Sequence, residues 1–283
     1  MRGDAASMRV LRPRTIEEAL DAFARRPHAM PLAGGTDFMV SWNAGGENGR
    51  AVIDLSALTA WKRVRTSGRG VRIGALATHW QLQHEAPVMK HFPLLVDACA
   101  TIGGRQIQSR GTLGGNIANA SPAGDTFPPL AVYEAKVRLR SVSGRRTLAF
   151  LDVFEGVKKT SLAAGELIES IDIDAAKKPT RQLFRKVGTR AASAISKTVA
   201  AGLLWTRPDG TIRELRFALG SMATTVRRLH RVEAFVAGKK PTAEVVDEAV
   251  RLLEEDVSPI DDLRSTRFYR LEVSRNLLQA FIR

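Results

Sequence analysis

The pattern of hydrophobic and polar positions predicts a mixture of helices and strands in the first 175 residues. Thr15-Ile-Glu-Glu18 is a capping box at the start of the amphipathic stretch TIEEALDAFARR, which stops before Pro27. A second capping box, Thr78-His-Trp-Gln81, predicts another helix start, and a buried helix is expected over Phe92–Thr101. Short apolar or alternating runs predict strands at Met30–Ala33, Ala51–Leu55, Val71–Ala77, Ala135–Ser141 and Glu166–Ile173. This order lacks the regular βαβ spacing of a doubly wound sheet.

The character of the sequence changes at Ala175–Pro179, which we interpret as a linker between two domains, 1–176 and 177–283. Three strand-like runs follow it, and the turn Arg207-Pro-Asp-Gly210 joins the last two as a hairpin. The strands are expected at Arg181–Val187, Ser196–Trp205 and Ile212–Leu219, and helices at Thr225–Ala237, Thr242–Glu255 and Asp261–Ile282. Strands followed by helices predict an α+β second domain.

Composition places the chain among ordinary globular proteins. Its 283 residues are enough for two domains. Hydrophobic residues make up 44% of the chain and charged residues 25%, and this balance argues against disorder. The longest uncharged run, Gly111–Gly124, is too short for a bilayer, which needs about 20 apolar residues. No apolar signal segment is visible near Met1, so we expect a cytoplasmic protein with no membrane contact.

The charge balance is strongly basic, with 43 Lys and Arg against 29 Asp and Glu and a net charge of +14. The most one-sided stretch, Ala175–Pro208, has eight basic residues and no acidic one. A solvated basic face explains this pattern, but so does contact with an anionic cofactor, an acidic subunit or nucleic acid.

Cysteine and histidine usage excludes several kinds of site. Cys99 alone forms no intrachain disulfide and holds no iron–sulfur cluster, which needs about four ligands, and we expect it in the core. The five histidines form no HExxH motif and no pair at i, i+4, so no metal site is predicted. His79 and His84 are expected to flank a polar helix face.

The first glycine-rich segment is Pro31-Leu-Ala-Gly-Gly-Thr-Asp37, where a strand-like run breaks. Glycine permits a positive φ and a close approach of the backbone to a ligand. Successive N–H groups there form a nest for phosphate oxygens, and Thr36 adds a hydroxyl donor. On its own, the segment is equally consistent with an ordinary turn.

The second glycine-rich segment, Gly111–Asp125, combines small residues, amides and hydroxyls, with Leu113 and Ile117 as apolar anchors. We expect this segment to wrap around a dinucleotide. Its backbone N–H groups would bind the pyrophosphate, Asn116 and Asn119 the polar edges of the ligand, and Asp125 a ribose hydroxyl. The alternative is a packed loop that binds no ligand. No P-loop sequence is present, and the glycines of Gly68–Gly74 precede a strand, so we interpret them as a hairpin turn.

Several motifs occur in a characteristic order along nearly the whole chain. They are Ala33-Gly-Gly-Thr-Asp37, Val52-Ile-Asp-Leu55, Ile73-Gly-Ala-Leu76, Gly103-Gly-Arg-Gln-Ile107, Gly111-Thr-Leu-Gly-Gly-Asn116, Ala120-Ser-Pro-Ala-Gly-Asp125, Lys186-Val-Gly-Thr-Arg190 and Asp262-Leu-Arg-Ser-Thr-Arg-Phe-Tyr-Arg270. In this order the chain resembles the FAD-binding medium subunit of the molybdenum hydroxylases, the xanthine dehydrogenase and carbon monoxide dehydrogenase group.

The resemblance implies an α+β fold. A two-subdomain FAD-binding (PCMH-type) domain of the vanillyl-alcohol oxidase class would precede a small α+β domain with an antiparallel sheet and helices. It also implies noncovalent FAD between the two glycine segments. The cofactor contacts that it implies are Leu32, Ala33, Gly34, Gly35, Thr36, Asp37 and Phe38 on the adenine and diphosphate side, Ile107, Gly111, Thr112, Gly115, Asn116 and Asn119 on the rest of the dinucleotide, Asp125 on a ribose hydroxyl, Leu167 and Ile168 by packing and backbone atoms, and Lys186 near the isoalloxazine ring.

In this family the subunit passes electrons out of the complex. A large subunit with the molybdenum cofactor hydroxylates a substrate, a small subunit with two [2Fe–2S] clusters relays electrons, and FAD passes them to NAD or another acceptor such as oxygen or a quinone. The chain would then need no catalytic residue of its own, and Lys186 would stabilise negative charge on the reduced ring. The four-cysteine insertion of some relatives is absent, and the organic substrate stays open because it binds another chain.

Three other functions are weighed against this one. A stand-alone flavin oxidoreductase of the same fold needs a large cap domain, for which 283 residues leave little room. A scaffold that has lost flavin would not be expected to keep both glycine segments. A basic nucleic-acid-binding module is disfavoured because aromatic residues make up only 6% and no binding motif is present.

Overall fold

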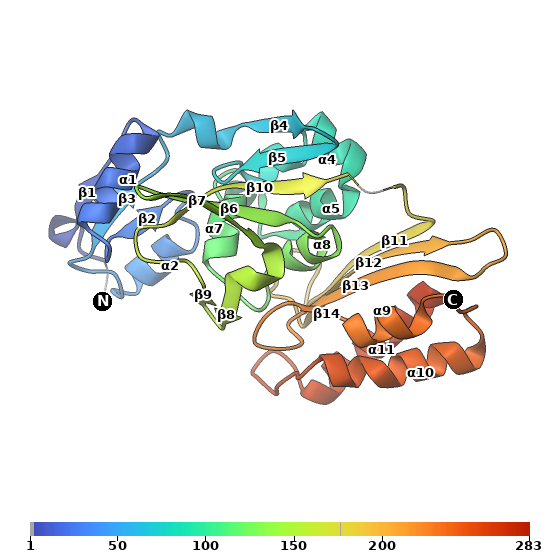
Figure 1. Cartoon of the computed structure of the whole chain (residues 1–283). Coiled ribbons are helices and arrows are strands. Elements are labelled where there is room, and N and C mark those ends of the chain that lie inside the picture. Colours follow the sequence, from blue (N-terminus) through green and yellow to red (C-terminus); the bar gives the residue numbers. More distant parts are fainter. Residues whose placement is uncertain (1–2, 176) are drawn as a thin grey trace.

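The computed structural model describes residues 3–175 and 177–283 (Figure 1). The first part of the chain begins with a small three-stranded parallel sheet in the order β1-β3-β2. Its elements, with a short 3-10 turn at Ala5–Ser7, are β1 (Arg9–Leu11), α1 (Ile16–Arg25), β2 (Met30–Leu32), α2 (Phe38–Asn43) and β3 (Ala51–Asp54). Half of the predicted capping box is present: the Thr15 hydroxyl accepts from the Glu18 N–H at 3.1 Å, while the Glu18 carboxylate accepts from the N–H of Arg14, at 2.7 Å, and not from that of Thr15.

A five-stranded antiparallel sheet, in the order β4-β5-β10-β6-β7, forms the second subdomain. Its strands are β4 (Val64–Ser67), β5 (Gly70–Gly74), β6 (Lys136–Ser141), β7 (Gly144–Ala149) and β10 (Leu167–Asp174), and the hairpin β8 (Phe154–Gly156) and β9 (Lys159–Thr160) projects beside it. Its helices are α3 (His79–Leu82), α4 (Ala86–His91), α5 (Pro93–Thr101), α6 (Arg105–Gln108), α7 (Leu113–Ala118) and α8 (Phe127–Val132), with 3-10 turns at Thr59–Lys62 and Phe150–Val153. The family's expected two-subdomain architecture is confirmed.

The last hundred residues form a four-stranded antiparallel sheet with helices on one face (Figure 1). The elements are β11 (Arg181–Val187), β12 (Thr198–Thr206), β13 (Ile212–Gly220), β14 (Arg227–Arg228), α9 (His230–Val236), α10 (Ala243–Asp256) and α11 (Arg267–Ile282). The predicted linker falls partly on Ala176, which lies outside the described residues.

Three predicted elements need correction. The Gly111–Asp125 segment is not a continuous loop, because α7 occupies its centre and begins at the cap Thr112. The helix expected from Thr225 begins only at His230, since β14 comes first. The helix expected from Asp261 begins at Arg267 behind the cap Thr266, because Asp262 and Ser265 pair in a tight turn.

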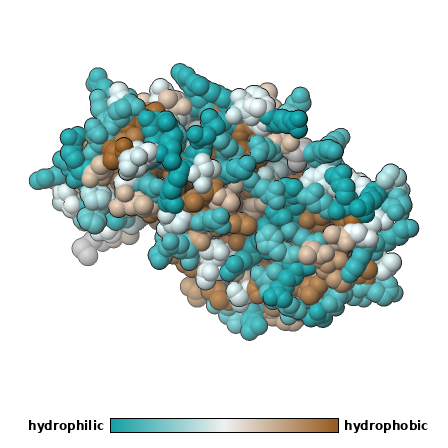
Figure 2. Space-filling model, viewed as in Figure 1, coloured by the Kyte–Doolittle hydropathy of each residue, from teal (hydrophilic) through white to brown (hydrophobic). Residues whose placement is uncertain are grey.

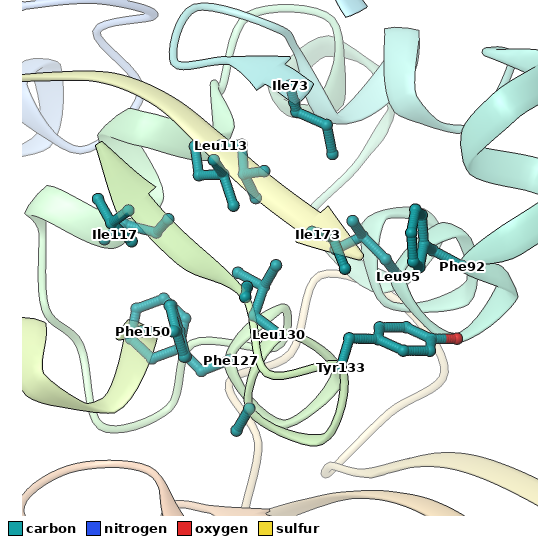
Figure 3. Packing of buried hydrophobic residues seen from close by; sticks show 14 of the residues in the cluster. Ile73, Phe92, Leu95, Leu113, Ile117, Phe127, Leu130, Tyr133, Phe150 and Ile173 are labelled. Atoms are coloured by element: carbon teal, nitrogen blue, oxygen red, sulfur yellow. The ribbon is translucent and has the colours of Figure 1, made fainter. Parts of the chain in front are cut away.

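One hydrophobic core connects the two parts of the chain. Side chains of the five-stranded sheet and of α5, α7 and α8 pack together, among them the labelled residues of Figure 3. The same cluster includes Ala201, Leu203 and Trp205 of β12 and Ala218 of β13. The C-terminal sheet therefore lies between α5 and α8 on one face and α9 and α11 on the other.

Arginines of the C-terminal sheet cap the carboxyl end of α8. Arg228 donates to the Ala131 carbonyl at 3.1 Å, and Arg216 donates to the Val132 carbonyl at 3.3 Å. Cations at a helix C-terminus are favourable because the last carbonyls carry partial negative charge. Arg228 is also paired with Glu233 at 2.6 Å, with only 7% and 10% of the two side chains exposed.

His79 is buried, which corrects the expectation that it flanks a polar face. Its side chain is 2% exposed, its Nδ1 lies 3.6 Å from Cys99 Sγ, and its backbone N–H donates to the Gly111 carbonyl at 3.0 Å. Cys99 lies in the core, as expected. Burial lowers the pKa of His79 from 6.5 to about 4, so the ring supports the second glycine segment as a neutral group.

On the face shown in Figure 2, apolar residues form separate patches within a mostly hydrophilic surface. Within residues 3–175 and 177–283, no helix combines the length and apolar character that crossing a bilayer requires.

We expect Arg228→Gln to lower the free energy of unfolding by about 3 kcal/mol, because it removes the ion-pair partner of the buried Glu233 carboxylate. This carboxylate then keeps the Phe217 N–H and the exposed His230 as neighbours. Denaturant unfolding followed by circular dichroism measures the change. The matched control is Arg227→Gln at the adjacent exposed position, which we expect to shift stability by less than about 0.5 kcal/mol. Equal effects of the two variants would contradict the role given to Arg228.

We expect the free energy of unfolding to decrease as the pH falls from 6.5 to 4, with His79 contributing about 3 kcal/mol of the loss. In this range the unfolded chain binds a proton at His79 and the folded chain does not, so acid favours unfolding. Urea unfolding at several pH values measures the slope. His79→Gln should flatten it and His84→Gln, at an exposed position, should not; identical slopes for both variants would contradict the assignment.

Candidate functional site

A cleft of about 850 Å³ runs between the two parts of the chain. Its lining comes from within residues 37–40, 102–107, 116–125, 157–158, 193–196, 221–224 and 258–270. It therefore lies where the second glycine segment, together with Asp37 at the end of the first, meets the C-terminal domain. This volume suits a drug-sized or dinucleotide ligand.

The first glycine segment presents a row of free backbone donors. Among the residues that the structure describes, the N–H groups of residues 33–37 donate to no protein acceptor. Gly35 has a φ of +77°, which turns the chain from β2 toward α2. Consecutive unpaired N–H groups around such a turn form an anion-binding nest.

The second segment is anchored in the core. Leu113 and Ile117 of α7 are fully buried and point into the cluster of Figure 3. Most of its N–H groups are used by the fold: that of Gly115 donates to the Thr112 hydroxyl at 3.1 Å, and that of Leu113 to the Ala77 carbonyl at 2.9 Å. The structure thus differs from the expectation of a donor-rich loop, because helix formation and β-type pairing consume these donors.

The two segments lie against each other, and the contact requires glycine at Gly34, whereas at Gly115 a Cβ would be at ordinary van der Waals distance from Ala33. A Cβ at Gly34 would lie 1.9 Å from the Arg110 carbonyl oxygen, and one at Gly115 would lie 3.9 Å from the Ala33 Cβ. Asn119 completes the contact by donating to Asp37 Oδ1 at 3.1 Å. The backbone donors of the first segment are therefore held beside the amide side chains of the second.

Asp125 lies on the cleft lining and joins the two parts of the chain. Its Oδ2 accepts from Lys186 Nζ at 2.6 Å, and its Oδ1 accepts from Ser196 Oγ at 2.5 Å. Lys186 also donates to the Thr101 carbonyl at 3.0 Å. Burial raises the pKa of the Asp125 carboxyl, and Lys186 and Ser196 act in the opposite direction.

Arg270 holds the C-terminal wall of the cleft in place. It is 3% exposed and donates to the carbonyls of Lys197 and Ser221 at 2.5 and 3.1 Å and to Asp262 Oδ1 at 2.8 Å, while its buried Nε has no partner. The Ser221 N–H in turn donates to the Pro122 carbonyl at 2.8 Å, which ties this wall to the second glycine segment.

The predicted site residues divide into three groups. Those on the cleft lining are Asp37, Ile107, Asn116, Asn119 and Asp125. Ten others are not on the lining: Lys186 contacts the lining residue Asp125, Phe38 follows the first glycine segment, and within the two segments lie Leu32, Ala33, Gly34, Gly35, Thr36, Gly111, Thr112 and Gly115. Leu167 and Ile168 are 3% and 7% exposed, with side chains in the hydrophobic clusters, so only their backbone is left to face a ligand.

Sequence reasoning missed Lys158, Ser196 and Arg270. Each comes from a segment without a glycine-rich signal, and each lines the cleft. Arg270 stands in the Asp262–Arg270 motif that was noted, but its burial was not foreseeable. In the described part of the chain, no three His, Cys, Asp or Glu side chains lie close enough to hold a metal ion.

Comparison with known proteins agrees with this geometry. Residues 6–175 match the model of the FAD-binding domain in molybdopterin dehydrogenase, and residues 183–283 match the CO dehydrogenase flavoprotein C-terminal domain. The glyceraldehyde dehydrogenase medium chain of Sulfolobus acidocaldarius is 29% identical, with 96% of each chain covered. The xanthine dehydrogenase FAD-binding subunit of Escherichia coli O157:H7 is 27% identical, with 96% of this chain and 93% of the relative covered.

Among solved structures, the carbon monoxide dehydrogenase of Hydrogenophaga pseudoflava includes a chain that superimposes with a TM-score of 0.91 at 26% identity, covering 97% of this chain and 95% of the other. Two family models together span nearly the whole sequence in the expected order. The chain therefore belongs to the FAD-binding medium subunits of the molybdenum hydroxylases, the xanthine and carbon monoxide dehydrogenase family.

Proposed function

We propose that the chain binds one FAD noncovalently in this cleft and transfers electrons from a [2Fe–2S] partner subunit to a diffusible acceptor. The observation that carries the proposal is the row of free N–H groups at residues 33–37, held against the second glycine segment. A diphosphate needs such donors, and the fold gives them no other partner. When bound, FAD supplies the redox chemistry, accepting electrons singly and releasing them in pairs.

The chain's own residues bind and orient in this proposal. Gly34 and Gly35 let the backbone approach the diphosphate, Ile107 packs against a ring, and Asn116 and Asn119 meet polar edges. Asp125 keeps lone pairs beyond those used by Lys186 and Ser196, so it still accepts from a ribose hydroxyl. Lys186 is not on the lining itself, but its ammonium pairs with the lining residue Asp125 and brings a positive charge to this end of the cleft.

The partners in this proposal are a large subunit with the molybdenum cofactor and a small subunit with two [2Fe–2S] clusters. The relatives support a multi-subunit role, because their names describe medium chains and FAD-binding subunits. Those names also refer to different substrates, an aldehyde and a purine, at nearly the same identity to this chain. Substrate choice is therefore assigned to the large subunit.

The purified chain, supplied with FAD and desalted, should retain flavin absorption and release FAD, not FMN, on heating. Chromatography of the released cofactor identifies it. A folded chain that retains no flavin, either alone or with its molybdenum and iron–sulfur subunits, would overturn the proposal.

Gly34→Ala should weaken FAD binding by about tenfold or more, because its Cβ would meet the Arg110 carbonyl oxygen at 1.9 Å and push the two segments apart. Fluorescence titration with FAD measures the change. The matched control is Gly156→Ala, where a Cβ meets nothing within 4 Å and affinity should stay the same. Thermal unfolding without FAD separates loss of the fold from loss of the site.

The acceptor in the proposal is NAD⁺. Exposed apolar side chains on the cleft rim, Val40, Ile195 and Ile260, offer packing for a planar nicotinamide. Anaerobically reduced complex should be reoxidised faster by NAD⁺ than by oxygen or a quinone in stopped-flow mixing. The reverse order of rates would replace NAD⁺ with the faster acceptor and leave the FAD site unaffected.

A further inference from the structure

The tip of the β8–β9 hairpin reaches across to the junction of the two glycine segments. Lys158 lies at this tip with a φ of +57°, and its N–H donates to the carbonyl of Ala120 at 3.0 Å. Ala120 also has a positive φ, of +45°. Non-glycine residues are disfavoured in this region and keep it only where the surroundings impose it. Both residues of the hydrogen bond that positions Lys158, namely Lys158 and Ala120, therefore have strained backbone conformations.

The side chain of Lys158 ends between residues of both glycine segments. Its ammonium donates to Asn119 Oδ1 and lies 3.6 Å from Asp37 Oδ1, to which Asn119 also donates. These three residues come from three separate segments, and all of them line the cleft. Lys158 keeps 51% of its side chain exposed, so it stays accessible from the cleft.

The charges around the nest require a cation at this position. Asp37 is the last residue of the nest and its side chain is 68% exposed, so its carboxylate opposes a bound anion. Among the described residues that line the cleft, the other cations are Arg264 and Arg270, and both are paired with Asp262 on the far wall. Of these three cleft-lining cations, Lys158 is the one beside Asp37, and the exposed Asp37 carboxylate is its ion-pair partner.

We propose that Lys158 is a phosphate-binding residue that supplies the positive charge for a dinucleotide diphosphate at the nest of residues 33–37. This inference rests on the proposed function and adds a residue to it, since backbone donors alone were expected to hold the diphosphate. On binding, the ammonium exchanges the Asp37 carboxylate for phosphate oxygens. The Lys158 ammonium would then have both the Asp37 carboxylate and the diphosphate within reach. It favours the diphosphate, because the diphosphate carries more negative charge than one carboxylate.

Equilibrium binding of FAD and of riboflavin, which has no phosphate, tests the inference on the full chain. Lys158→Met should weaken FAD binding by about tenfold, the usual weight of one charge-assisted hydrogen bond, and leave riboflavin binding unchanged. It should also reduce the salt dependence of FAD affinity, because screening acts on the charge that the variant removes. Lys158→Arg should restore most of the affinity, since it keeps the charge.

The matched control is Lys159→Met on the same hairpin. Lys159 pairs with Glu155 at 2.8 Å, is 72% exposed and does not line the cleft, so neither ligand's affinity should change. A Lys158→Met protein that binds FAD as tightly as the parent, or loses FAD and riboflavin equally with an unchanged salt dependence, overturns the inference. A parent chain that binds no FAD in the assembled complex overturns the proposed function instead.

Discussion

The buried ion pair between Asp125 and Lys186 is the contact on which the geometry of the cleft depends. Asp125 is the last residue of the second glycine segment, whereas Lys186 belongs to the C-terminal sheet, so the pair crosses between the two parts of the chain. A carboxylate that is 8% exposed is costly without partners, and Lys186 and Ser196 occupy both of its oxygens. The two parts therefore dock in one register, and that register sets the width of the cleft.

Other arginines also hold parts of the chain together. Arg228 and Arg216 bind the carboxyl end of α8, away from the cleft, and Arg270 joins the carbonyls of Lys197 and Ser221 at the cleft wall. Each of these arginines donates to backbone carbonyls. The planar guanidinium, with five N–H donors, can reach several acceptors at once in a fixed geometry, which a lysine ammonium does less well. The positive charge of these three arginines is thus structural and does not by itself indicate an anionic partner.

The sequence predicted most elements because local signals agreed with tertiary packing. Thr15 and Thr78 were recognised as caps from their own spacing, and β11 matched its predicted bounds. The helix over Leu113–Ala118 was missed because its two glycines and its asparagine have low helix propensity. Burial of Leu113 and Ile117 stabilises this helix in the folded chain.

The candidate site was predictable only where it depends on backbone shape. The pair Gly34-Gly35 predicts a close approach of the backbone to another group. In the structure, Gly34 packs closely against the Arg110 carbonyl. Lys158 and Ser196 carry no local signal, and the motif that contains Arg270 does not reveal its burial, because the positions of all three in the cleft depend on which distant segments meet. The burial of His79 was invisible for the same reason, since its partner Cys99 and the Gly111 carbonyl lie 20 and 32 residues further along the chain.

The position of β12 between two helical layers has a consequence for biosynthesis. When a ribosome has released only the first part of the chain, the faces of α5 and α8 that later meet β11–β13 are open to water, and Asp125 has neither Lys186 nor Ser196. Because domains generally fold as units with the N-terminal one first, a chain at this stage of translation lacks these contacts. The far wall of the cleft is completed only when Arg270 has emerged, and prematurely terminated chains are left with half a pocket and an exposed apolar face that quality-control proteases recognise.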